Sequence, residues 1–256
     1  MRKILAFAAI GAIFSAVTAA SASASHSWNG YHWARTANPF TLKMGDNLTT
    51  SDWKSHLSIT SSDWSKSTVL DTTIGPGQSR NKRCQATAGQ DEICNGNYGY
   101  NGWLGVATIW LASGSLHITQ GTVKVNDSYF SLPQYNFATE KEHVMCQEVG
   151  HTLGLDHQDT SGISLDTCMD YYRNTSDTDT LSTSPNQHDY DELSAIYSHV
   201  DTSTTVGAAI ANNLPDAVPS WSPASRMSES VYVDHLANGQ TLVTYVLWAN
   251  PFQVNF

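Results

Sequence analysis

Residues 139–157, TEKEHVMCQEVGHTLGLDH, form the segment around which the rest of the fold is predicted. Thr139, followed three residues later by Glu142, has the capping-box pattern that begins a helix. Gly154 predicts the end of that helix, because glycine readily adopts the left-handed conformation that terminates helices. We therefore expect a helix from about residue 139 to the residue before Gly154.

Three side chains of this segment are spaced to bind one metal ion. Gln147 and His151 are four residues apart, so on a helix they project from one face, one turn apart. His157 follows the turn at Gly154 and approaches from another direction. Three ligands leave a fourth tetrahedral position for water, which is the arrangement of a catalytic zinc site. Glu148, next to the first ligand, can take the proton from that water.

The segment resembles the metzincin signature HExxHxxGxxH, which it matches at Glu148, His151, Gly154 and His157. The chain is similar in this respect to the matrixin- and astacin-like zinc peptidases. Gln147 stands where the signature has its first histidine. A glutamine amide oxygen can bind zinc, but it is a weaker donor than imidazole.

A methionine turn is the second point of resemblance. Residues 168–171 read CMDY and look like the turn that lies beneath the metal in metzincins. In the astacin and serralysin branches, the tyrosine two residues after this methionine approaches the zinc, and Tyr171 occupies that place. The resemblance covers about residues 30–200 and implies hydrolysis of peptide bonds in proteins. Glu148 is then the general base, and Tyr171 stabilises the oxyanion.

Other histidines could supply the third ligand in place of Gln147. His143 shares the helix face, but it lies two turns from His151, about 12 Å along the axis. His117 and His188 could reach the metal only through tertiary contacts. We therefore keep Gln147 as the predicted ligand.

The N-terminus predicts export from the cell. Arg2 and Lys3 precede an apolar run from Ile4 to Ala20, and alternating small residues follow. This is the pattern of a secretory signal peptide, with cleavage expected after Ala22 or Ala24. No later segment is long and apolar enough to span a membrane, so we expect a secreted protein.

Four cysteines in an exported chain predict two disulfides, for which three pairings are possible. Cys84 and Cys94 lie in a long loop that a bond between them would close. If the methionine turn lies beneath the zinc helix, as the resemblance implies, Cys146 and Cys168 also come close. We expect these two pairs.

The predicted fold is α+β, with a metzincin-like twisted and mostly parallel sheet, a zinc helix, a methionine turn and a C-terminal helix. We expect a signal peptide at 1–24, a peptidase domain at 25–201, and an arm with a β-hairpin at 202–256. Residues 104–111 are predicted to be an antiparallel edge strand, which would bind a peptide substrate by strand addition. Residues 75–102 are predicted to be a long loop.

The charge and composition of the chain limit the classes of partner it could bind. The net charge is −10 and no basic residues cluster, so nucleic acid is excluded as a partner. We expect a monomer that acts on proteins or peptides. Asp177 and Asp179 could bind a structural calcium ion. Two rival hypotheses are a metzincin-like protein that binds metal or peptide with little or no cleavage, and a glycan- or surface-binding protein suggested by the eight tryptophans.

Overall fold

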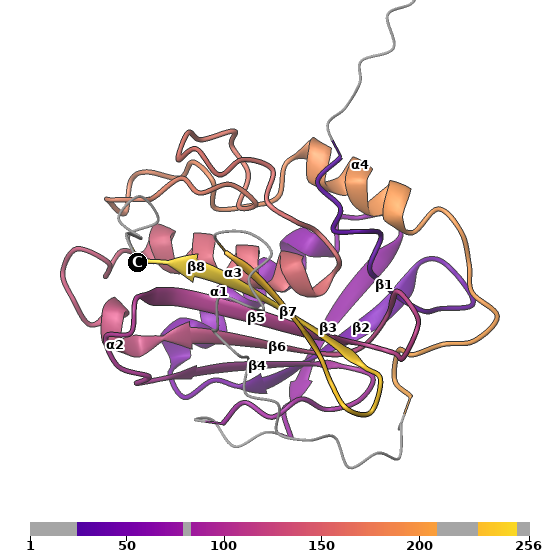
Figure 1. The fold of residues 1–256 in the computed structure, drawn as a ribbon. Coiled ribbons are helices and arrows are strands. Elements are labelled where there is room, and N and C mark those ends of the chain that lie inside the picture. Colours follow the sequence, from indigo (N-terminus) through magenta and orange to yellow (C-terminus); the bar gives the residue numbers. More distant parts are fainter. Residues whose placement is uncertain (1–24, 79–82, 209–229, 250–256) are drawn as a thin grey trace, which may run out of the picture.

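A mixed β-sheet forms the centre of the computed structural model, which describes residues 25–78, 83–208 and 230–249 (Figure 1). The strand order is β3-β2-β4-β6-β5-β8-β7, and β1 pairs with β6 outside this path. The strands are β1 (His32–Trp33), β2 (Phe40–Asn47), β3 (Leu70–Pro76), β4 (Asp91–Gly96), β5 (Trp103–Leu111), β6 (His117–Asn126), β7 (Val231–His235) and β8 (Thr241–Trp248). Strands β1 to β4 and β6 pair in parallel, whereas β5, β7 and β8 pair antiparallel.

Four helices complete the described part of the chain: α1 (Ser51–Trp64), α2 (Asp127–Phe130), α3 (Ala138–Thr152) and α4 (Gln187–Ile196). Figure 1 shows α1 and α3 against one face of the sheet. The indole of Trp64 in α1 donates a hydrogen bond to the Cys146 carbonyl of α3. The α+β fold class is therefore confirmed. None of the described helices could cross a membrane.

The predicted capping box of α3 is wrong. The residue before the helix is Phe137, which makes no side-chain capping bond. Glu142 instead accepts hydrogen bonds from His56 at 2.6 Å and Thr60 at 3.1 Å, both in α1. A buried imidazole and hydroxyl compete better for this carboxylate than the helix start does. The helix ends as predicted, because Gly154 has φ +100°.

Strand β4 lies inside the region that was predicted to be a loop. The amino-acid composition of β4 does not indicate a buried strand, because Asp91, Glu92 and Asn95 are polar. All three are nevertheless fully buried between β2 and β6. Strand β2 was not predicted either, although its apolar residues Phe40, Leu42 and Met44 occupy every second position and are buried.

The C-terminal hairpin joins the main sheet. Strand β8 pairs antiparallel with β5 along its length, from Leu111 opposite Thr241 to Trp103 opposite Trp248. The hairpin, yellow in Figure 1, therefore lies along β5. The prediction that residues 104–111 form an edge strand is wrong, because β6 and β8 flank β5 on its two sides.

Both predicted disulfides are present, Cys84–Cys94 and Cys146–Cys168. The second bond joins the middle of α3 to the residue before Met169. The predicted methionine turn is thereby attached directly to the predicted zinc helix.

Candidate metal centre

His151 and His157 face each other at the end of α3. Their Nε2 atoms are 3.0 Å apart, and their rings lie at 76° to one another. His151 Nδ1 lies 2.9 Å from the Leu155 carbonyl oxygen, which can only accept a hydrogen bond. His151 therefore carries its proton on Nδ1 and presents a lone pair on Nε2, the form in which histidine binds metal.

The charge state of His151 fits the same role. Burial lowers the pKa of His151 well below its usual value, and the neighbouring His157 lowers it further. His151 is thus a neutral nitrogen donor whose Nε2 points at Nε2 of His157. Two ring nitrogens at this distance either share a proton or bind a cation between them.

Gln147 is fixed by the methionine turn. Its amide nitrogen donates to the carbonyls of Cys168 at 2.9 Å and Asp170 at 2.6 Å. An oxygen could not face two carbonyls, so these contacts determine which end of the amide is nitrogen. Oε1 must therefore point the other way, and within the described part of the chain this buried oxygen has no hydrogen-bond partner. A buried amide oxygen with a free lone pair fits a metal ligand.

Glu148, the residue after Gln147 in α3, lies against β5. A Cβ on Gly105 would come within 2.4 Å of Glu148 Oε1, so glycine at this point of β5 leaves room for the carboxylate. Burial raises the pKa of Glu148 well above its usual value, and the backbone amide of Ala107 opposes this rise only in part. The side chain has the environment of a group that exchanges a proton.

Tyr171 lies beside the histidine pair. Its ring centroid is 4.4 Å from that of His157 in an edge-to-face arrangement. Its backbone amide donates to Asp159 at 3.0 Å, which holds the segment after the methionine turn. The predicted residues Gln147, His151, His157 and Tyr171 are thus connected through α3, the turn after it and the methionine turn.

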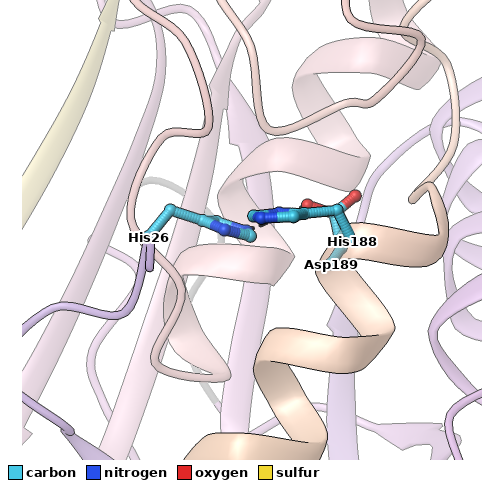
Figure 2. Close-up of side chains that lie close together, drawn as sticks. All are labelled: His26, His188 and Asp189. Carbon is cyan, nitrogen blue, oxygen red and sulfur yellow. Dashed lines mark hydrogen bonds and ion pairs between the residues drawn. The ribbon is translucent and has the colours of Figure 1, made fainter. Parts of the chain in front are cut away.

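No other described histidine, cysteine or carboxylate completes the site. None of them offers a ligand atom within 4.8 Å of both His151 and His157. His188 instead stacks on His26 with ring centroids 4.8 Å apart, next to Asp189, as Figure 2 shows. Gln147 therefore remains the candidate third ligand.

The predicted calcium site is not supported. Asp177 accepts a hydrogen bond from the backbone amide of Ala138 at 2.6 Å, at the start of α3. Asp179 accepts from the Tyr172 hydroxyl at 2.9 Å. Neither aspartate belongs to a cluster of potential metal ligands within residues 25–78, 83–208 and 230–249. Both side chains serve ordinary loop and helix hydrogen bonds.

Strand β8 covers the histidine pair from the side of β5. The ring of Tyr245 stacks on His151, with centroids 4.2 Å apart and planes 5° from parallel. Tyr245 is opposite Ala107 in the β5–β8 ladder and is fully buried. The backbone of β5 that was predicted to bind a substrate strand is thus hydrogen-bonded to the chain's own C-terminal hairpin.

Comparisons with known proteins include a structural likeness to a solved zinc-protease. No protein-family model matches the chain, and no curated protein matches its sequence. The chain is similar to high choriolytic enzyme 1, a hatching enzyme zinc-protease from the medaka fish Oryzias latipes. The TM-score is 0.37 and the identity 8%, over 66% of this chain and 96% of that one. A likeness this slight carries no weight, so the function has to follow from the site itself.

Proposed function

We propose that this chain is a secreted zinc-dependent endopeptidase of the metzincin type, which hydrolyses peptide bonds in proteins. The pair of imidazoles with Nε2 atoms 3.0 Å apart is the observation that carries the proposal. The unpartnered Oε1 of Gln147, one helical turn before His151, supports a third ligand on the same face. The bond between Cys146 and Cys168 holds these elements together.

In the proposed mechanism, different side chains bind the metal and transfer the proton. Gln147, His151 and His157 would hold the zinc ion. A bound zinc ion supplies a more acidic water and polarises the carbonyl of the scissile bond. Glu148 accepts a proton from the attacking water and later gives it to the leaving amine. Tyr171, beside His157, donates a hydrogen bond to the oxyanion.

The hairpin blocks strand addition of a substrate to β5 in the arrangement described. A peptide strand can pair with β5 only after β8 has left it, because each strand edge accepts one partner. In the proposed enzyme this arrangement, with Tyr245 stacked on His151, would be the closed form.

The same observation favours a second candidate, a metzincin-like protein that binds metal or peptide with little or no cleavage. In that case β8 stays on β5 permanently, and the glutamine ligand leaves the zinc too weakly bound for catalysis. The two candidates agree on the metal and differ on hydrolysis.

Digestion of casein separates the two candidates. We expect the purified protein to cleave casein, a chelator to stop cleavage, and zinc to restore it. Glu148→Gln should keep its zinc and lose cleavage, because Glu148 transfers protons and is not a ligand. Glu192→Gln in α4 is the matched control, since it makes the same change outside the site, and should behave like the unmodified protein. Bound zinc without cleavage of casein would support the second candidate, and absence of zinc would contradict both.

A further inference from the structure

A second group of potential metal ligands lies where the chain after α4 passes β1 and β6. His32, His117 and His199 direct their Nε2 atoms at Asp201 Oδ1, at distances of 3.6, 3.2 and 3.7 Å. The Nε2 atoms of His32 and His199 are 3.3 Å apart. We call these four residues the His32 cluster. Four ligands bound to zinc at about 2.0–2.1 Å in a tetrahedron lie about 3.3 Å from one another. The four distances given are near this value, and the ligand atoms of His32, His117 and Asp201 all lie within 4.8 Å of one another. The exposed ring of His199 would complete the tetrahedron by a small side-chain rotation.

The fold brings the cluster together from three distant parts of the sequence. Strands β1 and β6 pair in parallel with His32 in register with His117, so the two side chains lie side by side. The chain after α4 then returns past β1, where the Asp201 amide donates to the Arg35 carbonyl at 2.8 Å. His199, two residues before Asp201, thereby joins the pair. Nothing local in the sequence predicts this arrangement.

The tautomer of His32 presents an acceptor nitrogen to the cluster. Its Nδ1 lies 2.7 Å from the Gly30 carbonyl oxygen, which accepts the proton of Nδ1. Nε2 of the neutral ring then presents a lone pair to Asp201 and to His199. Because His32 Nε2 is an acceptor, only His117 and His199 can supply protons to the four facing atoms, across contacts of 3.2–3.7 Å. A metal ion can satisfy all four at once.

The carboxylate of Asp201 is held in a fixed orientation by hydrogen bonds to one of its two oxygens. Its Oδ2 accepts from the backbone amide of Arg35 at 3.1 Å and from the guanidinium at 2.9 Å. The same guanidinium donates to the His199 carbonyl. Oδ1 is therefore left to face the three imidazoles. Bonds of this kind behind the ligands orient them and sharpen metal binding.

We propose that His32, His117, His199 and Asp201 form a second, structural zinc site. Three imidazole nitrogens favour zinc over calcium or magnesium, which prefer oxygen ligands. Four protein ligands leave no position for substrate, which distinguishes a structural site from a catalytic one. A metal here ties β1, β6 and the segment after α4 to one another. The site does not depend on whether the chain is a peptidase.

The His26 group in Figure 2 is a weaker candidate. The rings of His26 and His188 are nearly parallel, at 20°, and their ligand atoms lie within 4.8 Å of one another and of Asp189. Asp189 is also occupied, because it accepts from His26 at 3.0 Å and from the Asn186 amide at 2.7 Å. Both oxygens of the Asp189 carboxylate are therefore already hydrogen-bonded, which makes this group the weaker candidate.

Metal analysis of single and combined variants tests the second site. The full-length protein is loaded with zinc, passed through a desalting column and measured by mass spectrometry of the metal. We expect two zinc ions per chain for the unmodified protein. His117→Ala with His199→Ala should lose one ion, and adding His151→Ala should remove the other. His235→Ala is the control, because this exposed histidine of β7 lies outside both sites, with its Nδ1 3.1 Å from the Thr241 hydroxyl, and the variant should keep both ions.

Thermal unfolding of the His151→Ala variant provides a second measurement. Only the proposed structural site then remains, so a chelator should lower the melting temperature. The same chelator should have no effect once His117 and His199 are also alanine. These substitutions are at partly exposed side chains, so the fold should tolerate them. Equal zinc content with and without His117 and His199 would overturn the proposal.

Discussion

Tyr245 connects the hairpin to the metal centre, and two substitutions there should change cleavage in opposite directions. The ring stacks on His151, and the buried hydroxyl has no hydrogen-bond partner among the residues described. When β8 leaves β5, that hydroxyl regains water. Tyr245→Phe keeps the stacking and removes the unsatisfied group, so it stabilises the closed form relative to the open form.

The size of the effect follows from the cost of the buried hydroxyl. An unsatisfied buried polar group costs about 1–3 kcal/mol. Because 1.4 kcal/mol is a factor of ten, Tyr245→Phe should lower the open population, and with it the rate of casein cleavage, roughly 5- to 140-fold. Tyr245→Ala removes a fully buried ring, a loss of about 3–5 kcal/mol for aromatic residues. It should raise the cleavage rate by at least about tenfold, even though the variant is less stable.

Hydrogen exchange of the β8 backbone amides, measured beside the cleavage rate, identifies the cause. Exchange should slow in Tyr245→Phe and accelerate in Tyr245→Ala, in parallel with cleavage. If the tyrosine hydroxyl took part in the chemistry instead, both variants would cleave more slowly. Slower cleavage by Tyr245→Ala with faster exchange would therefore refute the idea that β8 closes the site.

Three further perturbations have defined outcomes. Burial raises the pKa of Asp91 to about 7. Between about pH 4 and pH 7 the folded state therefore keeps a proton on Asp91 that the unfolded state has lost, so the free energy of unfolding falls as the pH rises through this range. Asp91→Asn should remove this pH dependence of the unfolding free energy, measured with urea. It should stabilise the protein at pH 8 by at most about 4 kcal/mol and give no gain near pH 3. An unchanged pH dependence would exclude Asp91 as its source. Gln147→His should strengthen zinc binding and Gln147→Ala should weaken it in competition with a chromogenic chelator, whereas equal affinities would show that Gln147 is not a ligand. Replacing Cys146 and Cys168 by serine should cost about 3 kcal/mol of unfolding free energy, and an unchanged urea midpoint would contradict that estimate.

The sequence predicted those features whose signals are local. The end of α3 at Gly154, the spacing of Gln147, His151 and His157, and strands β5 and β6 follow from residues close together in the chain. The disulfide between Cys146 and Cys168 followed from the methionine turn, which is also nearby.

The features that were missed depend on distant partners. Strand β4 carries polar residues that are acceptable only because their partners come from elsewhere, such as Thr152 for Asp91 at 2.7 Å. The hairpin was predicted, but its composition does not say that it pairs with β5. His117 was considered only as a ligand for the first metal, because its partner His32 is 85 residues earlier in the printed sequence.

The central claim is that Gln147, His151 and His157 bind one zinc ion. A crystal of the zinc-loaded protein, measured just above and just below the zinc absorption edge, tests it directly. The account predicts an anomalous peak about 2 Å from both Nε2 atoms and from Oε1 of Gln147. A zinc-loaded crystal with no peak between His151 and His157, or with a peak there that Gln147 does not contact, would contradict it.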